Sequence, residues 1–296
     1  MKKRIVITDS GLGGLSVLGE LEYRLRSDSV FENIELFFFN SLYSRNYGYN
    51  AMKSMEEKAI VFNNALTSIS QIYNPDLILI ACNTLSVVYP YTKFARITRT
   101  EVKGIVESGT VLFSAKMKSK NDAKIILFGT PTTVNSGVYT QQLISAGIKK
   151  ERIISQACPE LETAIQNNPG GNETEKLIEN FVKAGIKKSG QNFKNLFAGL
   201  CCTHYGYSQK TFYDKLKENF SGNIEILNPN NSMLDFLFEE TVERFSSCKL
   251  DIKIVSQVEI RRNEIESLTN ILSEKSPKTA LALDNYIFQK NIFNRK

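Results

Sequence analysis

Two cysteines, at positions 82 and 202, each follow an apolar run of the kind that forms a buried strand. Cys82 comes after residues 77–81, and Cys202 comes after residues 196–201. Small polar residues follow each thiol directly. Open α/β sheets bind ligands at the carboxyl ends of their strands, so the pattern predicts an ionisable thiol at each of two such edges. Two thiols that face one another across a cleft suit a two-sided proton transfer.

Inversion of the α-carbon of an amino acid requires a transfer of this kind. One face of the carbon needs a base and the opposite face needs an acid, and a thiolate and a thiol supply both. The thiol pKa of about 8.5 falls when donors or cations lie nearby, so a thiolate is accessible near neutral pH. Asp9 and His204 are candidates to shuttle or polarise the proton. The pattern leaves open that Cys82 and Cys202 are simply small buried residues that end strands.

A metal site is an alternative use of the same residues. Cys201, Cys202 and His204 lie close together, and Cys158 is a fourth candidate ligand. Structural zinc sites use cysteine pairs that are separated along the chain. Adjacent cysteines fit that pattern poorly, and His204 is the only histidine. No metal site is therefore predicted.

A glycine-rich turn, residues 11–14, follows the first apolar run and opens a helix. The dinucleotide pattern fails because Ser16 stands where its last glycine belongs, and the phosphate-loop pattern lacks its Gly-Lys-Ser/Thr. A helix N-terminus attracts anions, including a substrate carboxylate. Asp9 and Ser10 have a second interpretation as plain helix caps.

Strands and helices alternate along the chain, which predicts an α/β fold with parallel sheets. The first half is predicted as strand 5–8, helix 15–25, strand 34–39, a polar loop 40–50, helix 55–72 and a strand that ends at Cys82. The second half is predicted to begin near Val102, with strands 102–106 and 125–128, helix 134–146, strand 153–154, loop 167–173, helix 177–184 and strand 196–200.

The two halves form a weak internal repeat, because residues 5–10 match 126–130 and the Cys82 segment matches the Cys202 segment in the same order. This favours two similar parallel-sheet α/β domains that face each other with pseudo-two-fold symmetry, and an active site in the cleft between them. After Gln209, a helix, a strand at 224–227 and a helix at 233–245 are expected to complete the first domain. The predicted domains are 1–101 with 212–272, then 102–211, and a C-terminal extension at 273–296.

The composition indicates the cellular compartment of the protein and the classes of partner that it binds. The 296 residues are 42% hydrophobic and 23% charged, which is ordinary for a soluble globular protein. Five irregularly spaced cysteines indicate a reduced, intracellular protein, and the N-terminal apolar run is too short for a signal peptide. No stretch approaches the roughly 20 apolar residues that span a bilayer. The net charge of +6 is spread along the chain. We therefore predict a cytoplasmic protein with no membrane and no nucleic-acid partner.

Three segments carry a family resemblance: residues 9–15 (DSGLGGL), 81–84 (ACNT) and 202–205 (CTHY). They resemble the signature segments of the cofactor-independent glutamate racemases, within the aspartate/glutamate racemase superfamily. Residues 129–136 and 157–159 resemble lesser landmarks of the same family. Order and spacing agree from about residue 4 to residue 272. The joint occurrence favours catalytic thiols over cysteines that merely end strands.

The resemblance implies two facing α/β domains and no cofactor. It implies that Cys82 and Cys202 are the two catalytic bases, with Cys82 acting on D-glutamate and Cys202 on L-glutamate, and that Asp9 and His204 assist them. It places Tyr47 and Gly48 near the side-chain carboxylate of glutamate. The residues implied to hold the ammonium group and the α-carboxylate are Ser10, Asn83, Thr84, Thr130, Thr133 and Thr203. The D-glutamate formed would supply peptidoglycan synthesis, and a homodimer is a possible assembly.

The chain departs from the family pattern around the chemistry. Asn46 replaces a proline, Cys201 a glycine, Gly206 a proline, and Gln166 a glutamate near the mouth of the site. These changes leave aspartate or another amino acid open as the substrate. They also leave open a weakly catalytic member that binds a protein or DNA. The extension from Ser273 lies outside the resemblance, and is expected either to pack on the body as a helix at 280–289 or to contact a partner.

Overall fold

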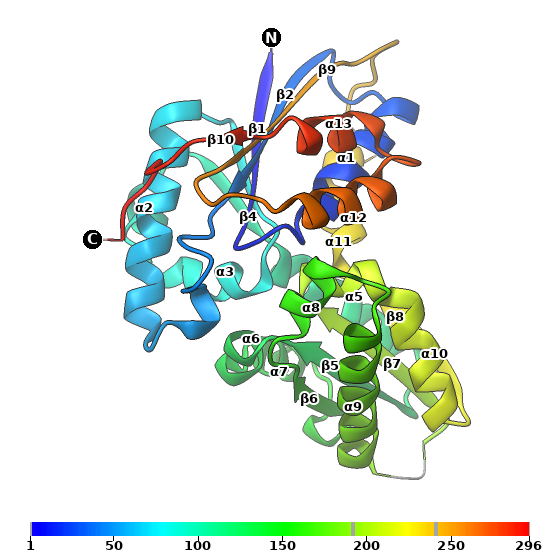
Figure 1. Ribbon diagram of the computed structural model, residues 1–296. Helices are drawn as coiled ribbons and strands as arrows, with labels where there is room; N and C mark the ends of the chain where they lie inside the picture. Colours follow the sequence, from blue (N-terminus) through cyan, green and yellow to red (C-terminus); the bar gives the residue numbers. More distant parts are fainter. Residues whose placement is uncertain (1, 191–192, 240–241, 296) are drawn as a thin grey trace. The chain divides into compact units, whose positions relative to one another are not determined.

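The computed structural model describes residues 2–190, 193–239 and 242–295, and the chain forms two compact units (Figure 1). The first unit runs to Ile105 and resumes at Met233. The second unit is Val106–Ser232. Each unit is an α/β fold built on its own parallel sheet, which confirms the predicted fold class.

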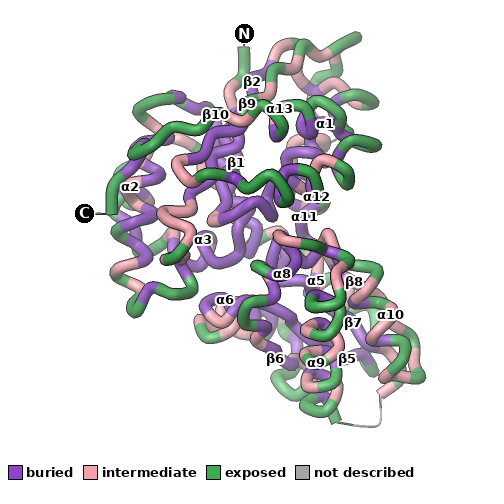
Figure 2. Tube along the Cα trace, viewed as in Figure 1, coloured by how far each residue is buried: buried purple, intermediate pink, exposed green. Residues whose placement is uncertain are grey.

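The first unit contains a six-stranded parallel sheet in the order β10-β9-β2-β1-β3-β4. Its central strands are continuous apolar runs, as expected for parallel strands covered on both faces. Figure 2 shows them as buried, and every residue of β3 is buried. The strands are β1 (Lys3–Asp9), β2 (Asn33–Asn40), β3 (Leu77–Ile80), β4 (Glu101–Gly104), β9 (Lys249–Ser256) and β10 (Ile287–Phe288).

Helix α2 of the first unit begins and ends where the sequence supplies caps. The long helix α2 starts after Ser54, whose hydroxyl accepts a hydrogen bond from the Glu57 amide at 3.1 Å. It ends at Asn74, which adopts the left-handed conformation with φ 42°. The helices are α1 (Leu15–Ser27), α2 (Met55–Tyr73), α3 (Asn83–Val88), α4 (Phe94–Ile97), α12 (Arg262–Leu272) and α13 (Pro277–Asp284), with short 3₁₀ turns η1 (Tyr49–Ala51), η2 (Tyr89–Tyr91) and η5 (Asp235–Phe238).

The second unit contains a four-stranded parallel sheet in the order β6-β5-β7-β8. Its strands are β5 (Ala123–Gly129), β6 (Ile153–Ala157), β7 (Asn195–Cys201) and β8 (Asn223–Leu227). Its helices are α5 (Ile105–Ser119), α6 (Pro131–Ser136), α7 (Val138–Ser145), α8 (Leu161–Asn167), α9 (Asn172–Ser189), α10 (Gln209–Asn219) and α11 (Pro229–Ser232), with 3₁₀ turns η3 (Lys150–Arg152) and η4 (Thr203–Ser208).

The internal repeat is present in the strand order. The series β2-β1-β3-β4 in the first sheet corresponds to β6-β5-β7-β8 in the second. Strand β1 pairs with β3, the strand before Cys82, and β5 pairs with β7, the strand before Cys202. The two thiols therefore follow corresponding strands of their units.

Two strands lie in the other unit from the one predicted. The strand near Val102 is β4 and pairs with β3 in the first sheet, and the strand at 224–227 is β8 and pairs with β7 in the second. The prediction that 212–227 completes the first domain is therefore wrong. The repeat explains the error, because β4 and β8 are the corresponding fourth strands of the two series. The residues of a strand do not by themselves determine which of two sheets the strand joins.

Two predicted helices also differ. The helix predicted at 134–146 is divided into α6 and α7 by Gly137, whose φ of 67° is left-handed and interrupts the helix. Within the helix predicted at 233–245, residues 240–241 lie outside the described part, and the described residues contain only the turn η5.

The C-terminal extension belongs to the body of the first unit. Its helix is α13, which starts at Pro277 rather than at residue 280, and it is followed by the short strand β10 beside β9. Both carboxylate oxygens of the buried Glu22 on α1 accept hydrogen bonds from backbone amides at the start of α13, at 2.9 and 2.7 Å. These bonds fix α13 on α1. Packing on the body, one of the two predicted alternatives, is what the structure shows.

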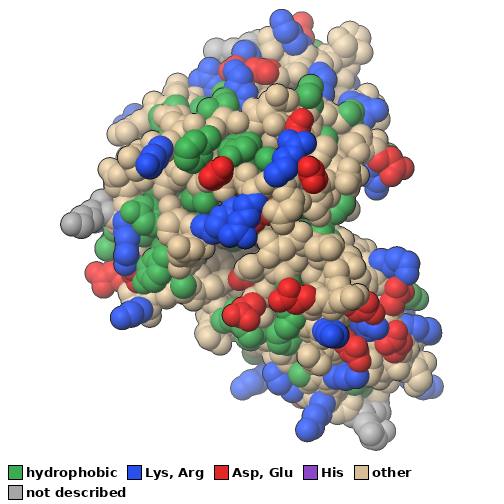
Figure 3. All heavy atoms as spheres, in the orientation of Figure 1, with side chains coloured by type: hydrophobic (Ala, Val, Ile, Leu, Met, Phe, Trp, Pro, Cys, Tyr) green, Lys and Arg blue, Asp and Glu red, His purple; other side chains and the backbone are tan. Residues whose placement is uncertain are grey.

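Charged groups are distributed over both units. Figure 3 shows Lys and Arg side chains interspersed with Asp and Glu on the face in view. No helix in the described residues combines the length and apolar character that a bilayer crossing requires.

Candidate active site

The first unit brings Ser10 and Cys82 together at the carboxyl ends of β1 and β3. The Ser10 hydroxyl lies 3.1 Å from the Cys82 sulfur. Cys82 is also the N-cap of α3, and its sulfur accepts a hydrogen bond from the Leu85 amide at 3.4 Å. A hydroxyl, which can donate or accept, and an amide donor therefore converge on one thiol that is only 6% exposed. A thiolate formed there would have partners already in place.

The electrostatic surroundings keep this thiol protonated at rest. Burial raises the pKa of Cys82 to about 12, and the negative charge of Asp9 raises it further, whereas the hydrogen bonds from Ser10 and Leu85 lower it. Ionisation at pH 8 is therefore unfavourable by several kcal/mol, on the order of 1.4 kcal/mol for each pH unit below that pKa. A bound cation, such as the ammonium group of an amino acid, would lower that cost.

Asp9 ends β1 and is buried, and one of its carboxylate oxygens accepts a hydrogen bond from the Gly11 amide at 3.1 Å. Helix α1 begins at Leu15, and its N-cap is Gly14, which makes no side-chain cap. The interpretation of Asp9 as the cap of this helix is therefore wrong. A Cβ on Gly14 would stand 2.9 Å from the Cβ and the carboxylate of Asp9, so the turn requires glycine in order to pass this close.

The other candidates of the first unit lie on α3 and on the loop before α2. Asn83 and Thr84 form the first turn of α3 and are each 3% exposed. The Tyr47 hydroxyl donates one bifurcated hydrogen bond, shared between the two carboxylate oxygens of Glu57, each at 3.2 Å. A Cβ on Gly48 would meet only a side-chain carbon of Leu42 at 3.5 Å, so nothing in its surroundings requires glycine.

Tyr49 is a residue that the sequence analysis missed. It lies in the same apolar cluster as Cys82, is 2% exposed, and its hydroxyl has no hydrogen-bond partner within the described chain. Burial raises its pKa well above the usual value, and a thiolate at Cys82 would raise it further. Its only sequence signal was membership of a tyrosine-rich stretch that reads as a polar loop.

The second unit places Thr130 and Thr133 at the carboxyl end of β5. Thr130 caps α6, where its hydroxyl oxygen accepts a hydrogen bond from the Thr133 amide at 3.3 Å and its hydroxyl donates to that of Thr133 at 3.1 Å. Both residues are 3% exposed. Thr203 follows β7, and its carbonyl accepts a hydrogen bond from the Asn230 side chain at 3.0 Å. These contacts hold the backbone around the second thiol.

Cys202 and His204 lie together after β7. The sulfur is 3.8 Å from Nδ1 of the imidazole, and Nε2 is 3.0 Å from the side-chain oxygen of Gln166 on α8. An amide oxygen only accepts, so this contact places a proton on Nε2. In the neutral ring Nδ1 then carries the lone pair, directed at the thiol. The arrangement provides an acceptor for the Cys202 proton.

The neighbouring cysteines do not join this group. Cys201 is the last residue of β7, and its sulfur lies 3.7 Å from the Gly199 carbonyl. Successive strand residues point to opposite faces of the sheet, so Cys201 and Cys202 point apart and do not chelate one ion. The Cys158 sulfur donates to the Gln156 carbonyl at 3.5 Å, and burial raises the pKa of both Cys158 and Cys201. Both are structural thiols.

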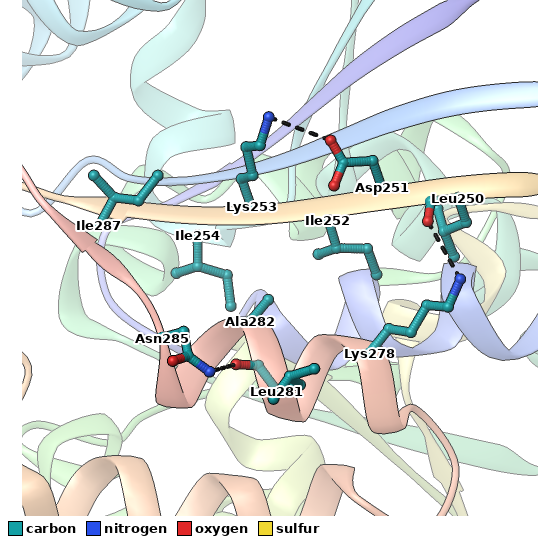
Figure 4. A pocket seen from close by; sticks show the side chains of 10 residues that line it. All are labelled: Leu250, Asp251, Ile252, Lys253, Ile254, Lys278, Leu281, Ala282, Asn285 and Ile287. Carbon is teal, nitrogen blue, oxygen red and sulfur yellow. Dashed lines mark hydrogen bonds and ion pairs between the residues drawn. The ribbon is translucent and has the colours of Figure 1, made fainter.

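A cavity of about 430 Å³ lies away from these groups, beside β9 and α13 (Figure 4). Its wall includes an ion pair between Lys253 and Asp251 at 3.2 Å, and Lys278 donates to the Leu250 carbonyl at 3.3 Å. It contains none of the candidate residues, so we assign it no part in the chemistry.

Comparison with known proteins identifies the family. No protein-family model matches the chain. A glutamate racemase of Sulfurihydrogenibium sp. (strain YO3AOP1) is 31% identical over 217 residues, which cover 70% of this chain and 73% of that protein. The chain belongs to the glutamate racemase family. A second member, the glutamate racemase of Aquifex pyrophilus, is 26% identical over 231 residues, which cover 78% of this chain and 80% of that protein.

Solved racemase structures share the fold. The glutamate racemase of Campylobacter jejuni superposes with a TM-score of 0.66 at 23% identity, covering 92% of this chain and 97% of the other. That of Francisella tularensis, solved with D-glutamate, gives 0.64 at 19% identity, covering 92% and 94%. An aspartate racemase of Picrophilus torridus gives 0.51 at 15% identity, covering 80% and 94%. At these identities the likeness establishes the fold alone.

Proposed function

We propose that this member of the glutamate racemase family interconverts L- and D-glutamate without a cofactor, using two thiols. The observation that carries the proposal is the repeat of site geometry in the two units. Cys82 follows β3 and Cys202 follows β7. Strand β3 pairs with β1, which leads to Asp9 and Ser10, and β7 pairs with β5, which leads to Thr130. Each thiol also has a polar side chain next to its sulfur, Ser10 in one unit and His204 in the other.

In the proposed reaction one thiol acts on each face of the substrate α-carbon. From L-glutamate, the Cys202 thiolate takes the α-proton and becomes a thiol. The Cys82 thiol then gives its proton to the opposite face of the carbanion and becomes a thiolate. D-glutamate leaves, and exchange with solvent restores the starting protonation of both sulfurs. The reverse reaction exchanges the two roles.

The surroundings of each thiol support this assignment of the acid and base roles. Burial keeps Cys82 protonated, as an acid in the L to D direction must be, and the Ser10 and Leu85 donors would stabilise the thiolate that results. His204 would accept the Cys202 proton at Nδ1 and so generate the thiolate that starts the reaction. Asp9 would assist on the Cys82 side.

The proposed substrate contacts come from hydroxyl, amide and backbone groups rather than from fixed charges. Side chains of Ser10, Asn83 and Thr84 in the first unit, and of Thr130, Thr133 and Thr203 in the second, would bind the ammonium group and the α-carboxylate. Tyr47 and Gly48 would lie near the side-chain carboxylate. The D-glutamate produced would supply peptidoglycan synthesis in the cytoplasm.

The test compares four amino acids in parallel on the purified chain: L- and D-glutamate and L- and D-aspartate. Loss of optical activity should occur with both glutamate enantiomers and be much slower with aspartate. Faster turnover of aspartate would assign the chain to that substrate, and absence of turnover with all four would refute the proposed activity.

Cysteine variants test whether Cys82 and Cys202 carry the two proton transfers. Cys82→Ala and Cys202→Ala should each lower kcat/KM for glutamate by at least about 1,000-fold, because one of the two proton-transfer groups is lost. Cys248→Ala is the matched control, since this half-buried thiol lies outside the proposed site. Near wild-type racemisation by either active-site variant would contradict the two-thiol mechanism.

A further inference from the structure

Residues 289–295, near the C-terminus, pack along α2 and the carboxyl end of β9. The Gln289 amide donates to the Ser256 carbonyl at 2.9 Å. The Ser68 hydroxyl and the Asn64 side chain, both on α2, donate to the carbonyls of Ile292 and Asn294 at 2.6 and 2.9 Å. Hydrogen bonds therefore hold the segment against β9 and α2 at several positions along its length.

Apolar packing fixes the same segment. Ile292 and Phe293 are 9% and 4% exposed and belong to the apolar cluster that also contains Cys82. The Phe293 ring centroid lies 5.9 Å from that of Phe39 and 6.2 Å from that of Tyr43. Tyr43 lies at the start of the loop that carries Tyr47 and Tyr49. The chain end is thus part of the core beneath this loop.

Arg295 reaches the loop directly. Its guanidinium carbon lies 4.6 Å from the centre of the Tyr47 ring, and the same group pairs with Glu57. Glu57 in turn accepts, on both carboxylate oxygens, the bifurcated hydrogen bond from the Tyr47 hydroxyl. The ring is therefore held on its face by a cation and at its hydroxyl by the carboxylate that neutralises that cation.

A neighbouring residue holds the start of the loop. The Gln257 side chain donates to the Tyr43 carbonyl at 3.0 Å and accepts a hydrogen bond from the Phe293 amide at 3.1 Å. One amide side chain therefore links the chain end to the loop. Together with Arg295 it fixes the loop at two points, Tyr43 and Tyr47.

We propose that residues 289–295 position the loop 43–49, and that Arg295 acts through Tyr47 as a positioning residue for the substrate's side-chain carboxylate. This proposal rests on the proposed function, which places that carboxylate near Tyr47. Arg295 itself does not touch the substrate. The tail thereby sets substrate affinity, and the thiols carry the chemistry.

The kinetic test uses Arg295→Ala, with Lys290→Ala as the matched control, because Lys290 is an exposed cation on the same tail. Loss of an exposed cation–π contact and an exposed ion pair should raise KM for glutamate by about 3- to 10-fold and leave kcat within about twofold. Arg295→Lys retains the charge without the planar guanidinium, so it should recover part of the loss. Lys290→Ala should match the wild type.

Hydrogen exchange gives a readout that does not depend on activity. Arg295→Ala should speed amide exchange within residues 43–52 and leave the strands of the sheet protected, whereas Lys290→Ala should change neither. If the wild type does not racemise glutamate, the proposed function fails and exchange alone decides this proposal. Unchanged exchange in Arg295→Ala would overturn it, and so would a loss confined to kcat.

Discussion

The contact between Ser10 and Cys82 gives the sharpest quantitative prediction. Ser10→Ala removes the hydroxyl that lies 3.1 Å from the sulfur and leaves the Leu85 amide as a donor. The variant should raise the pKa of the Cys82 thiol, since the lost hydrogen bond favours the thiolate. The expected consequence is slower racemisation in both directions.

The magnitude follows from the strength of that hydrogen bond. A hydrogen bond to a charged group contributes about 1.5–3 kcal/mol, which corresponds to about 10- to 100-fold in the thiolate population. The enantiomers have equal free energies in water, so kcat/KM for the two directions must remain equal in any variant. We therefore expect an equal loss of about 10- to 100-fold for L- and D-glutamate.

Two assays separate the thiol effect from an effect on substrate binding. Polarimetric initial rates give kcat/KM in each direction. Alkylation of Cys82 by iodoacetamide, followed by peptide mass spectrometry between pH 8 and 10 without substrate, reports the thiolate alone. Ser16→Ala is the control, because the Ser16 hydroxyl in the same turn donates to the Gly13 carbonyl at 2.8 Å.

The reasoning is refuted if Ser10→Ala alkylates at the wild-type rate and retains kcat/KM within twofold. A loss of kcat/KM with unchanged alkylation would assign Ser10 to substrate binding only. The claim that this hydroxyl stabilises the Cys82 thiolate would then be wrong.

Two further variants test the fold around the thiols. Gly14→Ala should lower kcat/KM at least about 10-fold and destabilise the fold by about 1–3 kcal/mol, because the new Cβ would meet Asp9 at 2.9 Å and must displace it. Gly170→Ala is the control, because a Cβ at this position would have no atom within 4 Å. This variant should change neither the activity nor the urea unfolding curve. Burial raises the pKa of Cys158, so above about pH 9 only the unfolded state ionises this thiol, and Cys158 alone should lower the free energy of unfolding by about 1.4 kcal/mol per pH unit, in addition to the declines from Cys82 and Cys201. Cys158→Ala should flatten that decline between pH 9 and 11 in urea titrations, and parallel curves for variant and wild type would contradict the argument.

The sequence was most informative where local pattern and burial agree. The predicted helix at 55–72 rests on Ala59, Phe62, Leu66 and Ile69, and all four are buried in α2. The strands before the two thiols were predictable for the same reason, since continuous apolar runs are typical of parallel strands covered on both faces. The positions of Ser10 and Cys82 at one sheet edge followed from the ends of their strands.

Such local patterns could not predict which segments far apart in the sequence pair or contact each other. Strand β9 pairs along β2, although the first five residues of 249–256 alternate between exposed and half-buried and the strand lies more than 200 positions away. The contacts of Gln166 with His204 and of Arg295 with Tyr47 join residues from separate elements. Tyr49 was missed because its burial depends on tertiary packing around Cys82, which a polar local sequence does not indicate.

The central claim is that protons reach the α-carbon from two separate sulfurs. Racemisation of L-glutamate in deuterated water, stopped early and analysed by mass spectrometry after separation of the enantiomers, tests it directly. The account predicts D-glutamate with deuterium at the α-carbon and recovered L-glutamate almost free of label. D-glutamate that keeps its original α-proton, or equal labelling of both enantiomers, would show that a single base serves both faces.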